Sequence, residues 1–95
     1  MGWTWDSAKD LANKRKHGLS FETARQVFFD PLAVSRPDPS TEEERWQTVG
    51  VIGSATVLVA HTLLRRGADT EDVGRIISAR KATPHERKAY EEGRF

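Results

Sequence analysis

Apolar residues recur along this 95-residue chain with two different periods, which divide it into predicted helices and predicted strands. Near the N-terminus they recur every three or four residues, the spacing of one helix face. This spacing predicts one helix after Asp6, ended by Gly18, and a second after Ser20, ended by Asp30 and Pro31. Asp6 and Ser20 are residue types that favour the N-cap position.

Shorter apolar runs follow, with the composition and period of strands. The predicted strands cover residues 3–5, 33–35, 45–52, 56–64 and 73–80. Gly53 and Ser54 separate two of them as a two-residue hairpin turn, whereas the prolines and acidic residues of segment 36–44 predict a loop. Thr83, Pro84 and Glu86 form a capping box with proline at the first helical position, which predicts a short final helix.

The order of these elements predicts an α+β fold. A small antiparallel sheet would carry two N-terminal helices on one face and a short C-terminal helix, and its other face would stay partly open. The length of 95 residues fits one domain, covering residues 1–95, without room for a second core.

Composition narrows the class of protein. Hydrophobic residues make up 37% of the chain and charged residues 31%, a globular balance that argues against disorder and against a membrane protein. The chain has no cysteine, so it can form neither a disulfide nor a thiolate metal site. No secretion signal is recognisable at the N-terminus, which predicts a cytoplasmic location without membrane attachment.

The charges nearly cancel, with 15 Lys and Arg against 14 Asp and Glu, so binding of a polyanion would depend on local clusters. One cluster, Lys14–His17, closes the first predicted helix. Cations at a helix C-terminus are stabilised by the helix dipole by about 0.3–1 kcal/mol, so this cluster needs no ligand. His17 stays open between that role and catalysis, because imidazole readily exchanges a proton near neutral pH.

The second cluster lies in the last predicted strand. In an ideal strand Arg75 and Lys81 share one face and Arg80 lies on the other, so Arg75 and Arg80 cannot serve one site without a bulge or a strand end. Arg80 also adjoins the N-terminus of the last helix, whose amides favour an anion. The alternative is that these arginines pair with Glu86, Glu91 or the glutamates of 42–44. Arg45, which follows those glutamates, is equally a site cation or their partner.

Other conspicuous residues have structural interpretations. The three tryptophans are expected in the core or an interface, and His61 as a strand histidine with its hydrogen bonds satisfied. Tyr90 is expected to pack its ring under the sheet with its hydroxyl outward. No paired-histidine motif, cysteine pair or glycine-rich phosphate loop is present, so we predict neither a metal nor a cofactor.

Two long segments together resemble a known family. WDSAKDLANKRKHGLSFETARQVFFDP (5–31) and GRIISARKATPHERKAYEE (74–92), with EERWQTVG between them, are similar to the BrnT family, the toxin half of a bacterial type II toxin–antitoxin system. The resemblance implies a RelE-like fold and a ribonuclease that inhibits translation and growth. It also implies neutralisation by BrnA, a small DNA-binding antitoxin that would form a heterotetramer with the toxin and contact operator DNA for the complex.

RNA can be cleaved without a metal when its 2′-hydroxyl attacks the adjacent phosphorus, which requires a base, an acid and cations around the phosphorane. We expect Arg80 and Arg45 to clamp the phosphate and His17 or Glu22 to transfer protons. The predicted substrate-binding residues are Arg75, Lys81, Lys16 and Tyr90, of which Arg75 and Lys81 form the alternative cation set. Two other readings stay open: a non-catalytic module that holds nucleic acid or an acidic protein, and a toxin scaffold without activity.

Overall fold

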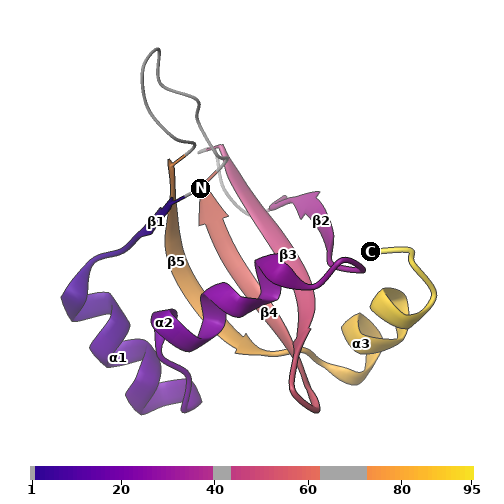
Figure 1. Ribbon diagram of the computed structural model, residues 1–95, viewed down its shortest axis with the longest axis horizontal. Helices are drawn as coiled ribbons and strands as arrows, with labels where there is room; N and C mark the ends of the chain where they lie inside the picture. Colours follow the sequence, from indigo (N-terminus) through magenta and orange to yellow (C-terminus); the bar gives the residue numbers. More distant parts are fainter. Residues whose placement is uncertain (1, 40–43, 63–72) are drawn as a thin grey trace.

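Five strands form one sheet in the order β1-β5-β4-β3-β2 in the computed structural model, which describes residues 2–39, 44–62 and 73–95. The strands are β1 (Gly2–Thr4), β2 (Val34–Pro37), β3 (Arg45–Ile52), β4 (Ala55–Thr62) and β5 (Val73–Lys81). The helices are α1 (Ser7–His17), α2 (Phe21–Ala24), the 3₁₀ helix η1 (Arg25–Phe29) and α3 (Pro84–Glu91). The predicted α+β fold is confirmed, with a sheet that is mostly antiparallel (Figure 1).

The predicted strands differ from the observed ones mainly at the edges of the sheet. β1 pairs in parallel with β5, and the hairpin of β3 and β4 turns at Gly53, whose φ is 61°. β2 runs on to Pro37, so Arg36 belongs to a strand and lies opposite Gln47 instead of opening a loop. An edge strand tolerates a proline because its outer side needs no amide donor. The predicted residues 63 and 64 of β4 lie outside the described part of the chain.

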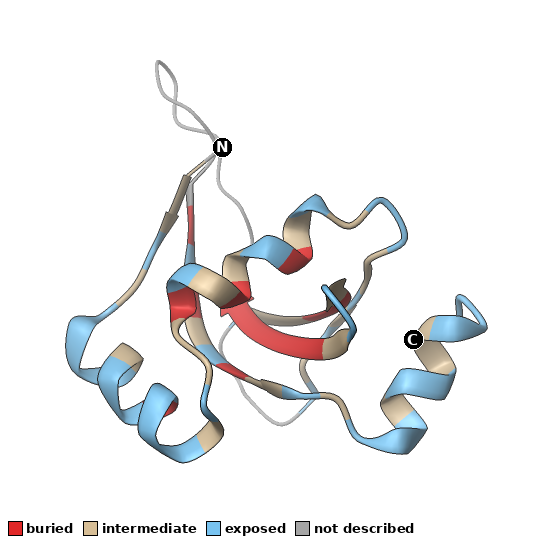
Figure 2. Cartoon of the chain, turned by 60° about the horizontal axis from the view of Figure 1, so that its bottom comes forward, coloured by how far each residue is buried: buried red, intermediate tan, exposed pale blue. Residues whose placement is uncertain are grey.

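α2 and η1 cover one face of the sheet and lie in front of the strands in Figure 1, whereas α1 lies beside β5; these three helices together form the helical layer. The second predicted helix tightens into η1 from Arg25 onward, as helix ends often do. Apolar residues of this layer pack on the central strands, where most of the buried residues lie in Figure 2. This core contains Phe21, Ala24, Val27, Val57, Val59, Ile76 and Ala79.

Two local features fix the helical layer to the sheet. A Cβ on Gly50 would lie 2.9 Å from the carbonyl oxygen of Val27, so glycine lets η1 approach β3 closely. The buried Asn13 side chain on α1 donates to the Ala79 carbonyl at 2.9 Å and accepts from the Ala79 amide at 3.0 Å. β1 pairs only with the first residues of β5, so the backbone of Ala79 lies beyond the end of β1. The side-chain amide of Asn13 binds the Ala79 backbone in place of a neighbouring strand.

A bulge in β5 decides which side chains share a face. Ala60 pairs with Ser78 but His61 pairs with Ile76, so β5 contains one extra residue between these pairs. Ile76 and Ala79 are both buried in the helical core although they are three positions apart. The bulge therefore reverses the alternation, and Arg75 and Arg80 lie on the same face, away from the helical core. The ideal alternation that would group Arg75 with Lys81 therefore does not hold in β5, and the bulge that the sequence analysis named as an exception is observed.

The face of the sheet opposite the helical layer is only partly open. Val49, Leu58 and Ala60 point away from the helical core but are 0%, 3% and 7% exposed. α3 contacts β3, and its Glu86 side chain binds Arg80 of β5. The short C-terminal helix α3 therefore covers part of the second face, and arginine side chains lie on the remainder.

Candidate functional site

Four arginines from three strands point to the face opposite the helical layer, and we call them the arginine face: Arg36, Arg45, Arg75 and Arg80. Arg45 lies opposite Thr62, whose hydroxyl accepts the Arg75 amide proton at 2.9 Å. These two arginines are therefore two strand separations apart, about 10 Å between Cα atoms. Arg80 lies opposite Leu58, nearer the other end of the same face. All four arginines share this face, but Arg45 and Arg75 lie nearer one end of it and Arg80 nearer the other, and a joint role for them stays a prediction.

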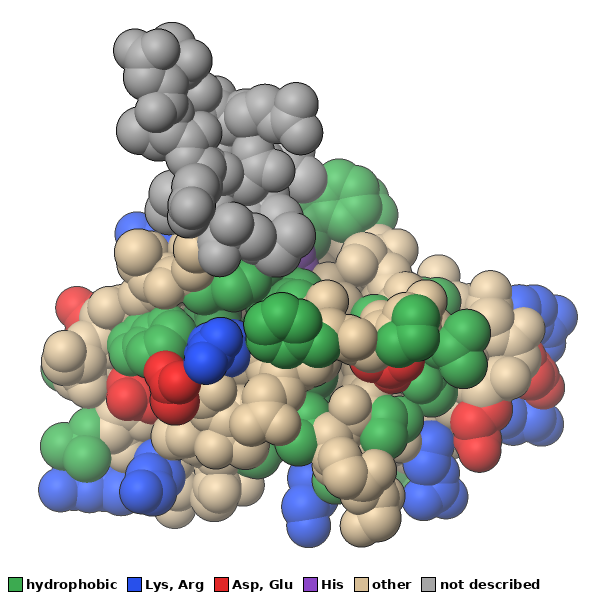
Figure 3. Space-filling model, viewed as in Figure 1, with side chains coloured by type: hydrophobic (Ala, Val, Ile, Leu, Met, Phe, Trp, Pro, Cys, Tyr) green, Lys and Arg blue, Asp and Glu red, His purple; other side chains and the backbone are tan. Residues whose placement is uncertain are grey.

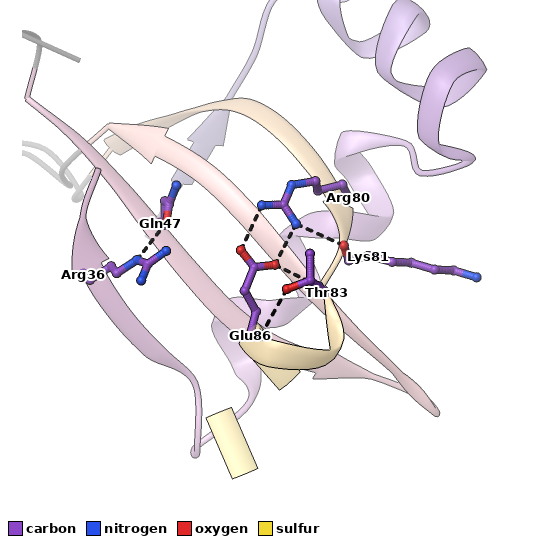
Figure 4. A network of polar contacts seen from close by, with 6 residues as sticks. All are labelled: Arg36, Gln47, Arg80, Lys81, Thr83 and Glu86. Carbon is purple, nitrogen blue, oxygen red and sulfur yellow. Dashed lines mark hydrogen bonds and ion pairs between the residues drawn. The ribbon is translucent and has the colours of Figure 1, made fainter. Parts of the chain in front are cut away.

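Arg80 forms the best-defined contact on this face. Its Nη1 and Nη2 atoms donate to Glu86 Oε1 at 2.7 Å and Oε2 at 2.9 Å, and Nη1 also approaches the Lys81 carbonyl at 3.3 Å (Figure 4). The bond with Arg80, ahead of smaller effects, lowers the pKa of Glu86 to about 2 and raises that of Arg80. The alternative that Arg80 pairs with Glu86 is therefore confirmed, but 37% of the Arg80 side chain remains exposed.

Glu86 is held in place by the start of α3. The Thr83 amide donates to Glu86 Oε1 at 2.8 Å, and the Glu86 amide donates to the Thr83 hydroxyl at 3.2 Å, which completes the predicted capping box. The carboxylate therefore caps a helix and orients a guanidinium at the same time. Arg80 has five N–H donors, of which three are accounted for by Glu86 and Lys81. Within the described part of the chain, the other two N–H groups of Arg80 have no partner and can bind an anion.

Tyr90 attaches α3 to the end of η1. Its hydroxyl donates to Asp30 Oδ2 at 2.5 Å, and the same oxygen accepts from the Val51 amide at 2.9 Å. This bond raises the pKa of Tyr90 to about 12 and is the main cause of the lowered pKa of Asp30. The hydroxyl expected to point outward is thus engaged with Asp30, and the substrate role of Tyr90 stays a prediction.

The remaining predicted site residues lie elsewhere. In Figure 4 the Lys81 side chain extends away from Arg80. With Ser54, Thr56 and Arg87 among its neighbours, it lines a hollow of about 260 Å³ at the end of the β3–β4 hairpin. Lys16 and His17 end α1, which lies beside β5. Glu22, on α2, pairs with Arg25 at 2.9 Å. Glu22 lies on the side of the sheet opposite the arginine face, whereas Lys16 and His17 lie beside its β5 edge, and the roles of all three in chemistry stay predictions.

Arg36, Gln47 and Phe95, which the sequence analysis did not select, lie together on the arginine face. Arg36 Nε donates to Gln47 Oε1 at 2.9 Å, and the Arg36 guanidinium carbon lies 4.1 Å from the centroid of the Phe95 ring. Arg36 was missed because the prolines at 37 and 39 predicted a loop. Residues 33–36 run apolar, apolar, polar, polar, so no alternation signalled that the strand continues to Arg36.

The helical face carries an aromatic cluster. Trp3 stacks on Phe28 with ring centroids 3.9 Å apart, and His61 meets both rings edge-on. His61 Nδ1 donates to the Thr62 carbonyl at 2.6 Å, and Nε2 accepts from the Thr48 hydroxyl at 2.6 Å. Burial lowers the pKa of His61, so the ring is neutral at pH 7. The prediction of a satisfied strand histidine is confirmed.

Beside this cluster is a hollow of about 310 Å³, lined by Gly2, Trp3, Trp5, Glu22, Arg25, Phe28 and Phe29. Phe29 is 73% exposed, and Leu32 nearby in sequence is 71% exposed. Figure 3, viewed from this side, shows hydrophobic side chains at the surface across the middle of the molecule. The two faces of the sheet therefore differ in chemistry: one is aromatic and apolar, and the other is rich in arginine.

Within residues 2–39, 44–62 and 73–95, no group of three or more His, Cys, Asp or Glu side chains is arranged to hold a metal ion. Among the same residues, no helix is long and apolar enough to cross a membrane.

A family model described as the ribonuclease toxin, BrnT, of a type II toxin–antitoxin system matches residues 5–86. This match includes both segments that carry the sequence resemblance, apart from the last residues of the second. No curated protein sequence matches the chain significantly. The matched range contains Arg36, Arg45, Arg75 and Arg80, together with Glu86 at its end.

Proposed function

Because the chain belongs to the BrnT family of ribonuclease toxins, which implies an RNA substrate and an antitoxin partner, we propose that the arginine face is its active site. The observation that carries this proposal is that four arginines from β2, β3 and β5 project from one side of the sheet. Guanidinium groups are suited to this task because their planar N–H donors match the oxygens of a phosphate.

We propose cleavage by transesterification. The ribose 2′-oxygen loses its proton and forms a bond to the adjacent phosphorus, the bond from phosphorus to the 5′-oxygen breaks, and that oxygen takes up a proton. The products are a 2′,3′-cyclic phosphate and a 5′-hydroxyl, so the step uses no water molecule as a reactant and requires no metal ion. Arg80, assisted by Arg45 and Arg75, would stabilise the negative charge that grows on the phosphorane oxygens.

The Arg80–Glu86 pair supports the view that the protein acts mainly by positioning the RNA phosphate. Glu86 fixes the guanidinium plane through two hydrogen bonds, and the two remaining N–H groups can bind a phosphate without breaking them. An ionised guanidinium cannot accept the 2′-hydroxyl proton, and Glu86, with a pKa of about 2, is a weak base. The rate would depend on charge stabilisation and alignment, which predicts a slow enzyme.

The proton-transfer groups predicted from the sequence would require a different substrate path. His17 and Glu22 belong to the helical layer, so either could act only if the RNA passes round the edge of the sheet near β5. A pH–rate profile that loses one limb in His17→Ala would support that path. An unchanged profile would leave the arginine face to act with solvent as the proton carrier.

The biological setting is proposed from the family. A BrnA-type, DNA-binding antitoxin would neutralise the toxin in the cytoplasm and form a heterotetramer with it, and only the antitoxin would contact operator DNA. Release of the toxin would inhibit translation and growth through RNA cleavage. Induction of the chain with and without a BrnA-type protein tests this setting, because growth arrest should occur only without it.

The decisive biochemical test uses the purified chain, single-stranded RNA and an excess of chelator. We expect cleavage with 2′,3′-cyclic phosphate ends, a loss of at least a hundredfold in Arg80→Ala, and unchanged cleavage in Arg15→Ala, which removes an exposed arginine of α1. The second candidate function, a non-catalytic binding module, is favoured by the weak basicity of Glu86. It predicts retention of intact RNA. Cleavage that requires a divalent metal, or ends with a 3′-hydroxyl, would refute the proposed chemistry.

A further inference from the structure

Arg36 is held so that its guanidinium plane is fixed while most of its donors stay available. The Phe95 ring covers the group at 4.1 Å, and Gln47 takes the Nε proton. Both Arg36 and Gln47 are half-buried. Within the described part of the chain, Arg36 has no carboxylate partner, in contrast to Arg80. A cation–π stack together with a hydrogen bond removes the rotational freedom that an arginine side chain normally retains.

This arrangement leaves a specific set of donors. Arg36 has five N–H groups, and after the bond to Gln47 the four on Nη1 and Nη2 have no hydrogen-bond partner among residues 2–39, 44–62 and 73–95. Gln47 uses its carbonyl oxygen toward Arg36, so its amide nitrogen adds two further N–H donors. The site therefore presents donors beside an aromatic ring, which are the components that bind an unstacked nucleobase in single-stranded RNA.

We propose that Arg36, Gln47 and Phe95 form a nucleobase subsite that prefers guanine. The two Nη atoms of a fixed guanidinium match the adjacent O6 and N7 acceptors of guanine. Adenine places an amino donor where guanine has O6, and it would oppose the arginine donors. Pyrimidines lack the N7 acceptor. The proposal deepens the function proposed above, since the base would belong to the RNA strand held at the arginine face.

The position of the subsite relative to Arg80 supports this assignment. Gln47 and Val49 project from the same side of β3, and Val49, Leu58 and Arg80 follow one another across three strands. Two strand separations and two residues along a strand place the Cα atoms of Gln47 and Arg80 about 12 Å apart. Figure 4 shows Arg36, Gln47 and Arg80 together, with Glu86 between them. Long side chains can therefore contact a phosphate at Arg80 and a base near Arg36 on one strand.

The test uses short oligonucleotides in which a single ribonucleotide confines cleavage to one phosphate, with the bases on both sides varied among G, A, C and U. Versions in which that ribose is replaced by deoxyribose cannot be cleaved, and their binding is measured by fluorescence anisotropy. The variants are Arg36→Lys, which keeps the charge but loses the planar pair of donors, and Phe95→Leu. Their matched controls are Arg15→Lys and Phe29→Leu, at exposed positions of the helical layer.

We expect the wild-type chain to prefer guanine at one flanking position by about tenfold or more, in cleavage and in binding. Arg36→Lys and Phe95→Leu should lose that preference, because cleavage of the guanine-flanked substrate should fall more than cleavage of the other sequences, and both controls should keep it. Cleavage without base preference, or a preference that survives both variants, overturns the subsite and leaves the ribonuclease proposal intact. Guanine-selective binding without cleavage, lost in Arg36→Lys, supports the subsite and overturns the proposed catalysis.

Discussion

Glu86→Gln is the substitution whose effect on stability can be worked out most directly. The side chain keeps its shape and can still cap α3, but it loses the charge that binds Arg80. The pKa of Glu86 falls from 4.5 to about 2, a difference worth roughly 3 kcal/mol at about 1.4 kcal/mol per pH unit. Because Arg80 is 37% exposed, solvent screens the pair, and we expect a loss of about 1–2 kcal/mol in the free energy of unfolding.

The lowered pKa of Glu86 also predicts how the stability difference between wild type and Glu86→Gln changes with pH. A carboxylate with a lowered pKa in the folded state stabilises the protein above the unfolded pKa, near 4.5, and this contribution disappears as the pH falls toward 2. Wild type and Glu86→Gln should therefore differ at pH 7 and converge between about pH 4.5 and pH 2. Urea unfolding followed by tryptophan fluorescence at several pH values measures the difference.

The matched control is Glu22→Gln, which removes one partner of the exposed pair with Arg25. Its Glu22 side chain is 66% exposed, and exposed pairs of this kind contribute less than about 0.5 kcal/mol. Equal stability of wild type and Glu86→Gln at pH 7 would refute the reasoning. A difference that persists unchanged at pH 2 would show that packing, and not charge, causes it.

Three further predictions concern α3, the helical layer and proton transfer. Tyr90→Phe removes a hydrogen bond to a charged acceptor and should lower the free energy of unfolding by about 1.5–3 kcal/mol, seen as a lower Tm; an unchanged Tm would contradict it. Gly50→Ala places a Cβ 2.9 Å from the Val27 carbonyl oxygen and should cost about 1–3 kcal/mol in urea unfolding, whereas Gly2→Ala, with open space around it, is the control. His17→Ala should leave the pH–rate profile of RNA cleavage unchanged if the arginine face acts alone, and loss of a limb would assign His17 a role in proton transfer.

Local signals in the sequence were sufficient to predict the helices and the central strands. The capping box of Thr83 and Glu86 and the turn at Gly53 depend on residues within four positions of one another, so a short stretch of sequence determines them. The same holds for the end of α1 at Gly18, whose φ of 72° suits glycine. The family resemblance extended these local predictions to a class of ribonuclease toxin, and the match over residues 5–86 confirms the family.

The composition of the candidate site was decided by contacts between residues far apart in the chain. Alternation along β5 separated Arg75 from Arg80, and only pairing with β4 introduces the bulge that unites them. Arg36 joins them because β2 pairs with β3, and Phe95 reaches Arg36 from the far end of the chain. Apart from the extension of β2 to Pro37, the sequence by itself determined which segments become helices and strands and which family the chain resembles. The tertiary structure alone decided which cations share a face, because strand register depends on packing across the sheet and not on neighbours along the chain.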